Sequence, residues 1–293
     1  MSETPGIAAA YYADRAVMER THVVENVRLA RDTYRVRIHC PTIARRILPG
    51  QFVMLRLAGW DDPLLGRPLA LYDTVLDADG QPTGIDVVYL VLGKMTSRLS
   101  LFAPGQEVDI WGPLGNGFAV SQTEHLIMVA GGIGQTPFLA VGLESLSRKR
   151  YGEPAREPGN VKRVTLCYGV RTAELLAGAD DFRTAGFDLR VSSDDGSVGH
   201  RGFVTDLLRD ALAESNGESR EVYCCGPEPM MEAVAEICRT ANVACQVSLE
   251  TPMACGVGIC FSCVAQVRQP DGTWDYKRTC VDGPVFDAEK IAW

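Results

Sequence analysis

The pattern of apolar and polar residues changes near residue 118 of the chain. Before that point, short segments alternate apolar and polar residues, as at Tyr34, Val36 and Ile38, which is typical of half-buried antiparallel strands. Pro-Gly and Asp-Gly pairs that favour turns separate the segments. Six such strands with one short helical piece predict a closed β-barrel. The expected strands are 22–30, 33–40, 51–59, 68–76, 84–93 and 107–115, and the helical piece is 96–102.

From His125 onward, an apolar strand-like segment is followed by a helix-like segment, and this order repeats. The alternation predicts a parallel sheet with helices on its faces, a fold that binds ligands at the carboxyl ends of its strands. We therefore expect an α+β multidomain chain, with a barrel in residues 16–118, an α/β domain in 119–250 and a small segment in 251–293. The expected strands are 125–132, 163–170, 187–193, 221–227 and 244–250, and the helices are 136–150, 172–177, 203–215 and 227–242.

Composition narrows the class of protein. Hydrophobic residues make up 46% of the 293 residues and charged residues 23%, as in a soluble globular protein. The net charge of −8 argues against nucleic-acid binding, which usually needs a basic surface. No apolar run approaches the roughly 18 residues of a membrane helix. The first 17 residues lack the basic start and apolar core of a secretory signal.

Four cysteines carry the most specific chemistry in the sequence. Cys255, Cys260, Cys263 and Cys280 form the pattern C-x4-C-x2-C-x16-C, which suits a [2Fe–2S] cluster held by four thiolates. Glycines in the first gap reach positive φ without steric cost, so a tight loop can wrap the cluster. Two alternatives are a structural zinc site and unrelated buried cysteines. Zinc sites favour two C-x2-C pairs, and the chain has only one.

The other six cysteines do not suggest a disulfide framework. Several lie within apolar strand-like or helix-like runs, where a free cysteine behaves as a small hydrophobic residue. This favours a reducing compartment, and hence a cytoplasmic protein. These cysteines are Cys40, Cys167, Cys224, Cys225, Cys238 and Cys245.

Two glycine-containing turns follow strands of the expected α/β domain. The first, residues 131–137, contains Gly132 and Gly134 and opens a helix, so its backbone N–H groups can approach a phosphate. The second contains Cys225, Gly226 and Pro227, where a proline at the helix start costs nothing. Tight turns that only pack or cap a helix would look the same.

An acidic turn lies between these two segments. Asp194 and Asp195 close the third expected strand of the domain, where the ribose of a dinucleotide would lie. A carboxylate at this position favours the free 2′-hydroxyl of NADH over the 2′-phosphate of NADPH. Acidic surface turns are common, so both nucleotides stay open at this stage.

The barrel contains two candidate anion sites. Arg67 begins the extended segment Arg67-Pro68-Leu69-Ala70-Leu71, and its planar guanidinium suits a pyrophosphate. A second segment with Gly93, Thr96 and Ser97 opens the short helical piece and offers hydroxyl groups to an anion. A surface ion pair for Arg67 and an ordinary helix cap for Ser97 are the alternatives.

In this order, the motifs resemble those of the electron-transfer subunits of NAD-linked dihydroorotate dehydrogenase, in the ferredoxin–NADP reductase-like superfamily. The resemblance covers nearly the whole chain, and the cysteine segment is its most specific part. It implies FAD in the barrel, NAD(H) in the α/β domain and a [2Fe–2S] cluster on the C-terminal segment. The resemblance also implies a partner, an FMN-containing catalytic subunit that interconverts dihydroorotate and orotate within a hetero-oligomer of pyrimidine biosynthesis.

The resemblance assigns roles to the candidate residues. Arg67 would hold the FAD pyrophosphate, with Leu69, Ala70 and Leu71 beside the isoalloxazine, and Gly93, Thr96 and Ser97 would complete the phosphate and ribose contacts. Pro68 is counted with them as a cofactor-binding residue. Gly132, Gly134, Cys225, Gly226 and Pro227 would frame the nicotinamide nucleotide, and the four cysteines would hold the cluster. The chain departs from the superfamily at Leu69 and Ala70, where Tyr and Ser are common, and at Met95, where Gly is usual. The choice between FAD and FMN stays open.

These parts predict an NAD-linked flavin iron–sulfur oxidoreductase subunit. A nicotinamide transfers a hydride, a cluster takes one electron at a time, and a flavin between them does both. Hydride transfer needs no acid–base residue, so we assign none. A related reductase subunit, of the NAD(P)H–ferredoxin, sulfide dehydrogenase or hydrogenase type, would have the same parts and a different partner. A redox sensor that holds a cluster without nicotinamide turnover is the second alternative.

Overall fold

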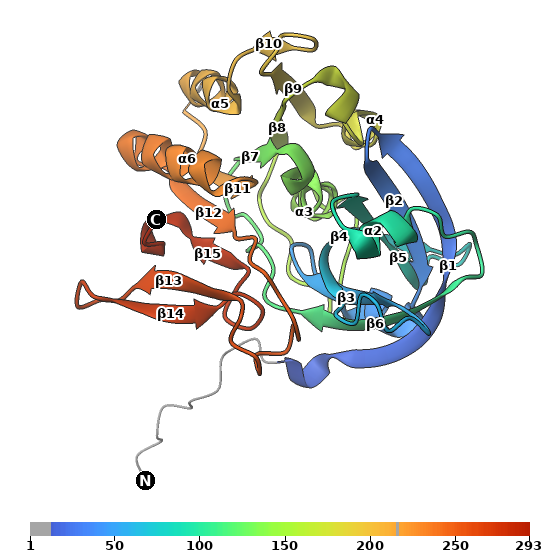
Figure 1. Cartoon of the computed structure of the whole chain (residues 1–293). Coiled ribbons are helices and arrows are strands. Elements are labelled where there is room, and N and C mark those ends of the chain that lie inside the picture. Colours follow the sequence, from blue (N-terminus) through green and yellow to red (C-terminus); the bar gives the residue numbers. More distant parts are fainter. Residues whose placement is uncertain (1–12, 215–216) are drawn as a thin grey trace.

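A computed structural model describes residues 13–214 and 217–293 of the chain. Residues 1–12 lie outside the described residues, and they include most of the segment that was judged not to be a secretory signal. The last residue of the expected helix 203–215 also lies outside them. The described part consists of a barrel, an α/β sheet domain and a C-terminal segment that touches both (Figure 1). Within it, no helix is long and apolar enough to cross a membrane.

The expected barrel is confirmed, and its six antiparallel strands close in the order β1-β2-β5-β4-β3-β6. Inward side chains such as Val36, Ile38 and Val53 are fully buried, as the alternating pattern requires. The strands are β1 (Val17–Ala30), β2 (Thr33–His39), β3 (Phe52–Leu57), β4 (Arg67–Leu76), β5 (Pro82–Leu90) and β6 (Glu107–Leu114), with α2 (Lys94–Leu99) after β5.

A further helix, α1 (Pro41–Arg46), fills one end of the barrel and was not predicted. It starts with a proline at its first turn and buries Ile43 and Ala44 in the barrel core. A six-residue helix has too few turns to show a 3.6-residue period, so the pattern of the sequence could not reveal it.

The second domain is a seven-stranded sheet in the order β10-β9-β8-β7-β11-β12-β15. All neighbours are parallel except β12 and β15, so the expected parallel sheet gains one antiparallel edge strand. The strands are β7 (His125–Gly131), β8 (Arg163–Val170), β9 (Asp188–Ser193), β10 (His200–Arg201), β11 (Arg220–Cys225), β12 (Ala244–Ser248) and β15 (Val285–Asp287).

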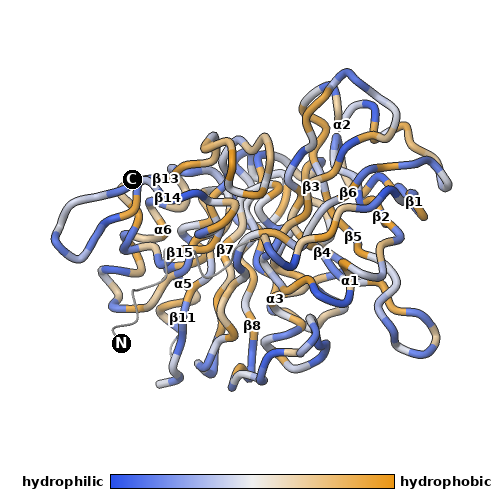
Figure 2. The backbone as a smooth tube through the Cα atoms, turned by 90° about the horizontal axis from the view of Figure 1, so that it is seen from below, coloured by the Kyte–Doolittle hydropathy of each residue, from blue (hydrophilic) through white to orange (hydrophobic). Residues whose placement is uncertain are grey.

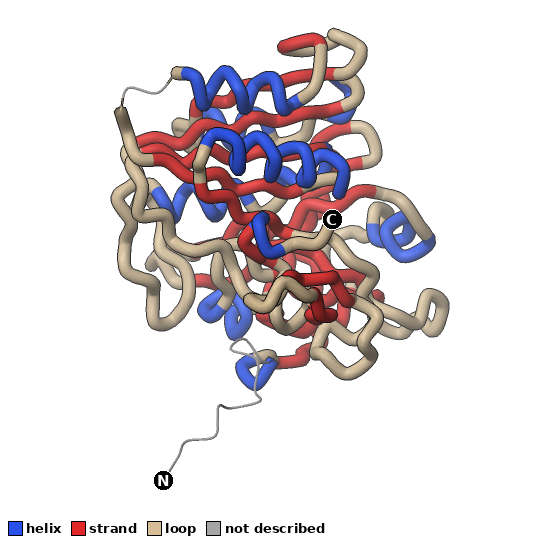
Figure 3. Tube along the Cα trace, turned by 90° about the vertical axis from the view of Figure 1, so that its left-hand side faces the viewer, coloured by secondary structure: helices blue, strands red, loops and turns tan. Residues whose placement is uncertain are grey.

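Helices cover both faces of this sheet (Figure 3). The core on one face contains side chains of α5 and α6, and the core on the other contains side chains of α3 and α4. The helices are α3 (Phe138–Ser145), α4 (Ala179–Thr184), α5 (Val204–Ala213) and α6 (Glu228–Ala241), and the 3-10 turns are η1 (Ala13–Arg15), η2 (Gly132–Gln135), η3 (Ala173–Leu175) and η4 (Ala288–Lys290).

One expected helix has a different form. The segment 172–177 contains only η3, and the helix of this crossover is α4, which begins after Gly178. Gly178 has a φ of 70°, a left-handed conformation that ends one turn and starts the next. Its neighbours fix this geometry, because an added Cβ would lie 2.7 Å from the hydroxyl of Tyr72.

The C-terminal segment is not a separate appendage. It leaves the sheet after β12, forms the hairpin β13 (Val264–Arg268) and β14 (Trp274–Arg278), and returns as β15 to pair with β12 (Figure 1). Residues 285–287 thus complete the sheet of the preceding domain. The segment is therefore held at both ends, which fixes its place beside the barrel.

Polar contacts fix the barrel against the sheet domain. The buried hydroxyl of Tyr72 donates to Asp181 Oδ2 over 2.7 Å, and Lys149 donates to Asp73 Oδ1 over the same distance. Away from this contact, both units carry apolar strands inside and hydrophilic loops outside (Figure 2). These buried and charged hydrogen bonds between the barrel and the sheet domain hold the two units in a fixed relative position.

Candidate functional site

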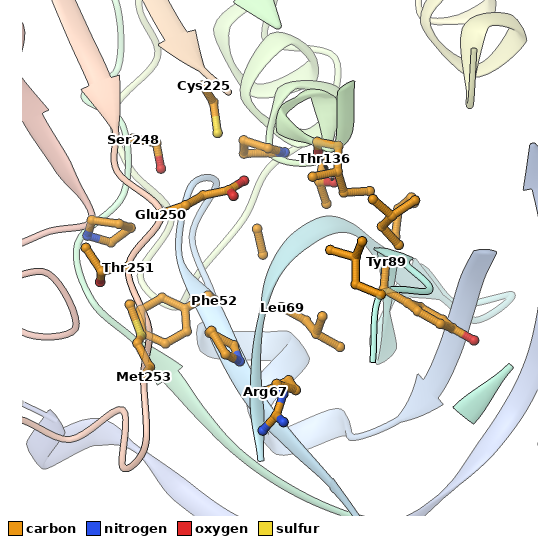
Figure 4. Close-up of a pocket in the computed structure, with 18 of the residues that line it drawn as sticks. Phe52, Arg67, Leu69, Tyr89, Thr136, Cys225, Ser248, Glu250, Thr251 and Met253 are labelled. Atoms are coloured by element: carbon orange, nitrogen blue, oxygen red, sulfur yellow. Dashed lines mark hydrogen bonds between the residues drawn. The ribbon is translucent and has the colours of Figure 1, made fainter. Parts of the chain in front are cut away.

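The first cleft lies between the barrel and the sheet domain and has a volume of about 600 Å³ (Figure 4). Strands β3, β4 and β5 provide one wall, and η2, β11 and the chain after β12 provide the other. Seven of the residues assigned to cofactor binding from the sequence line this cleft. They are Arg67, Pro68, Leu69, Ala70, Gly93, Thr96 and Cys225.

Arg67 is available to an anion. Its Nη1 donates to the carbonyl oxygens of Leu65 and Gly66, at 3.1 and 3.0 Å, and these bonds hold the side chain beside the cleft. Among the described residues, no carboxylate forms an ion pair with it, so the alternative of a surface ion pair has no support in the structure. A guanidinium held in this way suits a phosphate or pyrophosphate.

Two of the three departures from the superfamily, Leu69 and Met95, have a structural context. Leu69 is almost buried in the barrel core, and Phe52 supplies an aromatic ring to the same cleft. Met95 is 1% exposed and packs into the barrel core. The turn before α2 is held by Thr96, whose hydroxyl accepts the backbone N–H of Gly93 over 3.2 Å. The methionine therefore packs in the barrel core directly beneath the cleft that it helps to line.

The second cleft opens at the carboxyl ends of the sheet strands and has a volume of about 980 Å³. Gly132, Gly226 and Pro227 line it, in agreement with the position expected for a nucleotide in such a sheet. A Cβ added to Gly132 would meet nothing within 4 Å, so this residue presents bare backbone to the cleft. A phosphate can therefore approach closely at this point.

Three of the candidate residues do not line either cleft. Gly134 lies behind the second cleft, where an added Cβ would be 2.2 Å from the carbonyl oxygen of Cys225. Leu71 is fully buried in the barrel core, and Ser97 is exposed on α2. The motif around Gly134 thus has two functions, because one glycine faces the ligand space and the other allows η2 to pack on β11.

The two clefts share part of their walls. Leu90, Leu92, Ile133 and Glu250 line both, so molecules in the two clefts would meet there. Glu250 was missed in the sequence because it follows a strand without any recognisable motif. Its side chain is open to the cleft, and the surrounding protein raises the pKa of its carboxyl group by desolvation.

The far end of the second cleft is suited to an adenosine. Asp194 and Phe203 both line it, and the Phe203 ring is 72% exposed. Asp195, by contrast, is outside the lining and accepts hydrogen bonds from the backbone N–H and hydroxyl of Ser197, at 2.9 and 2.6 Å. Of the two acidic residues in this turn, Asp194 is the one placed to contact a ligand.

The four motif cysteines lie together in the C-terminal segment as two pairs. Cys263 and Cys280 are buried with their Sγ atoms 3.1 Å apart, and Cys260 interacts with Cys255 nearer the surface. No three His, Cys, Asp or Glu side chains in the described ranges surround one point where a single ion could bind. Four thiols in two pairs fit a two-iron cluster, in which each iron takes two of them.

The two pairs differ in their surroundings. A hydrogen bond with the hydroxyl of Ser262, at 3.0 Å, lowers the pKa of the exposed Cys260 to about 6. Burial raises the pKa of Cys280 to about 12 in the absence of a metal. Because Cys260 is exposed and Cys280 is buried, the Cys260 side of the site is the side open to solvent.

A small apolar core joins the cysteines to the first cleft. Phe52 and Met253 line the cleft and belong to the same packed cluster as Cys263 and Cys280. In addition, Trp111 Nε1 of the barrel donates to the carbonyl oxygen of Cys255 over 3.0 Å. The cysteine loop is therefore packed directly against the wall of the cleft.

Family models match two parts of the chain. Residues 250–292 match the iron–sulfur cluster binding domain of dihydroorotate dehydrogenase B, and residues 128–236 match an oxidoreductase NAD-binding domain. The first range contains all four motif cysteines. The second contains both glycine turns of the sheet domain.

Curated relatives match over almost their whole length. The electron transfer subunit of dihydroorotate dehydrogenase B (NAD(+)) from Geobacillus kaustophilus is 36% identical and covers 93% of this chain and 98% of its own. The same subunit from Caldanaerobacter subterraneus subsp. tengcongensis is 33% identical, covering 93% and 97%. The subunit from Fusobacterium nucleatum is 31% identical, covering 94% and 98%.

Solved structures agree on the fold. NADH-dependent reduced ferredoxin–NADP oxidoreductase, studied for flavin-based electron bifurcation, has a chain with a TM-score of 0.76 and 29% identity, covering 93% of this chain and 90% of its own. The ferredoxin reductase of a carbazole 1,9a-dioxygenase has a TM-score of 0.63 and 21% identity, covering 78% and 67%. The second likeness concerns the fold alone.

Proposed function

The chain belongs to the family of electron-transfer subunits of NAD-dependent dihydroorotate dehydrogenase B, and we propose that it carries electrons between NAD(H) and a catalytic partner subunit. One observation carries this proposal. The second cleft shares a wall with the first, and the first shares an apolar core with the cluster cysteines. Three redox groups bound at these places would stand in one continuous series.

The residues of the first cleft fit a flavin, and we assign FAD to it. A bound flavin would exchange a hydride with nicotinamide and single electrons with the cluster. Arg67 binds the pyrophosphate, Gly93 and Thr96 shape the adjacent turn, and Phe52 and Leu69 keep water from the ring. Ala70 offers no hydroxyl to the ring, so backbone groups beside it are left to contact the ring, and Thr136 offers a hydroxyl from the opposite wall.

The second cleft fits NADH. The pyrophosphate would lie against the bare backbone of Gly132, with Gly226 in the same lining, and the nicotinamide would reach the shared wall at Ile133. Asp194 accepts a hydrogen bond from a free ribose hydroxyl and repels a 2′-phosphate, so NADH is favoured over NADPH. Phe203 offers its exposed ring to the adenine.

The partner is the catalytic flavoprotein subunit of dihydroorotate dehydrogenase, which holds its own FMN and forms a hetero-oligomer with this chain in the cytoplasm. Its docking surface is the exposed side of the cluster loop. Ile259 and Phe261 flank the exposed ligand Cys260 and are themselves 74% and 63% exposed. Large apolar side chains beside an exposed redox ligand suit a protein interface rather than water.

A related reductase is the second candidate. The likeness to NADH-dependent reduced ferredoxin–NADP oxidoreductase favours it, because the same arrangement of domains occurs there with 29% identity over 93% of this chain. That candidate differs in the partner that receives the electrons. Reduction of a ferredoxin, with no effect of a dihydroorotate dehydrogenase catalytic subunit, would favour it.

The test is an anaerobic visible spectrum of the purified chain before and after addition of NADH, with NADPH as the control. The proposal predicts that flavin and cluster bands both bleach rapidly with NADH and slowly with NADPH. Bands that stay unbleached with both nucleotides would contradict it. A protein without cluster bands after anaerobic purification would contradict the assignment of the four cysteines.

A further inference from the structure

Arg278, the last residue of β14, lies against the loop that carries three of the four cluster cysteines. Its Nη1 donates to the carbonyl oxygen of Gly258 over 2.8 Å. Its Cζ lies 5.1 Å from the ring centroid of Phe261. Gly258 is in the gap between the first two cysteines, and Phe261 is in the gap between the second and third. One guanidinium therefore contacts both gaps of the motif.

The loop needs support at these two points because its backbone is strained. Phe261 has a φ of 56°, a conformation that L-residues with large side chains rarely adopt. Gly258 has a φ of 82° and approaches Arg278 closely, since an added Cβ would lie 3.3 Å from Nη1. The guanidinium donates to the carbonyl oxygen of Gly258 and at the same time lies over the face of the Phe261 ring, which stabilises both conformations.

Arg278 also binds the turn that contains the fourth cysteine, Cys280. Its backbone N–H donates to Asp282 Oδ2 over 2.9 Å, and its carbonyl accepts the N–H groups of Val281 and Asp282. Its Nε is 3.8 Å from the same Asp282 oxygen, so the carboxylate lies on the Nε side of the guanidinium. The Nη1 side of the guanidinium, whose positive charge is delocalised, faces the cluster loop.

We propose that Arg278 is a positioning residue for the cluster that also raises its reduction potential. This inference rests on the proposed cluster site. Reduction adds one negative charge to a cluster already bound by four thiolates, and a permanent cation at the loop favours that charge. The side chain is 25% exposed, so water screens this charge less than it screens the cations on the open surface.

Three variants of the full chain separate the charge from the contacts. Arg278→Gln removes the charge, and Arg278→Lys keeps the charge without the planar fork. The matched control is Lys277→Gln, because the neighbouring side chain points to the opposite face of β14 and pairs with Asp275 at 3.5 Å. Midpoint potentials come from electron paramagnetic resonance during a titration with dithionite and mediators. Cluster retention comes from the rate of iron release to a chelator.

We expect Arg278→Gln to shift the cluster's redox equilibrium about tenfold toward the oxidised form, equal to about 59 mV for one electron, with the flavin potential unchanged. Arg278→Lys should keep the wild-type potential and lose iron several-fold faster, and Lys277→Gln should match the wild type in both. An Arg278→Gln variant with the wild-type potential would overturn the charge effect. An Arg278→Lys variant that releases iron at the wild-type rate would overturn the positioning effect.

If Arg278→Gln cannot hold a cluster, iron release from the two remaining variants still tests the positioning role of Arg278. Faster iron release from Arg278→Lys than from Lys277→Gln supports the inference, and equal rates contradict it. The titration uses a chemical reductant, so a wild-type cluster that NADH fails to reduce would refute the proposed function and leave the role of Arg278 standing.

Discussion

Alanine substitutions at Gly134 and Gly132 separate packing from binding within one glycine motif. A Cβ at Gly134 would be 2.2 Å from the carbonyl oxygen of Cys225 and 2.5 Å from its carbonyl carbon. Relief would require η2 and β11 to move apart by about 1 Å, against the ladder that joins β7 to β11. Overpacking against backbone costs up to about 3 kcal/mol. We expect Gly134→Ala to lower the free energy of unfolding by about this amount.

The same change at Gly132 should act on the ligand. An added methyl group would meet no protein atom within 4 Å, so the only structural cost is the φ of 56°, about 1 kcal/mol. The methyl group would enter the space assigned to the pyrophosphate. We expect the Kd for NAD⁺ to rise at least about tenfold, which corresponds to about 1.4 kcal/mol.

Gly80→Ala is the matched control, because Gly80 has a φ of 76°, has open space around it and lies in a barrel turn. Urea unfolding measures stability, and titration calorimetry with NAD⁺ on the oxidised protein measures binding. Gly132→Ala and Gly80→Ala should lose similar stability, and only the first should lose affinity. Equal affinities in these two variants, or wild-type stability in Gly134→Ala, would refute the reasoning.

Four further predictions follow from single contacts. Trp111→Phe removes the hydrogen bond to Cys255, worth about 1 kcal/mol, and should speed iron release to a chelator; an unchanged rate would count against the bond. Burial lowers the pKa of His125 to about 4, so the free energy of unfolding should fall as the pH drops from 6.5 to 4, because the unfolded chain takes up the proton first. The fall should be about 1–2 kcal/mol after allowance for solvent screening, and urea unfolding of His125→Asn at each pH should not show it. Ile259→Ser should weaken binding of the catalytic subunit in calorimetry and leave NADH reduction intact, whereas wild-type affinity would move the docking surface elsewhere. Asp194→Ser should raise the rate of flavin reduction by NADPH relative to NADH in stopped-flow spectra, and an unchanged ratio would exclude Asp194 from discrimination.

Local spacing carried much of the prediction from sequence. The cysteine pattern depends on residues within one loop and the turn after the following hairpin, so its spacing was sufficient to indicate the cluster. The barrel and the alternating domain followed from periods of two and 3.6 residues. Arg67 and Gly132 were found for the same reason, since each lies in a short segment whose chemistry is complete in itself.

Features that depend on distant segments could not be predicted in this way. Glu250 lines both clefts, and no sequence pattern around residue 250 indicates that two clefts meet there. The different roles of Gly132 and Gly134 depend on β11, about ninety residues away. From the sequence, Phe52 was interpreted only as a residue of a barrel strand. In the structure it lines the first cleft and packs in the same apolar cluster as Cys263 and Cys280.

The most direct test of the account is the order of electron arrival after anaerobic mixing with NADH. Rapid freeze-quenching, followed by electron paramagnetic resonance, detects the reduced cluster, and stopped-flow absorbance follows the flavin. The account predicts that flavin absorbance falls first and that the signal of a reduced [2Fe–2S] cluster then appears at a matching rate. A fully reduced flavin with no cluster signal, while dithionite still produces one, would contradict a path from the first cleft to the four cysteines.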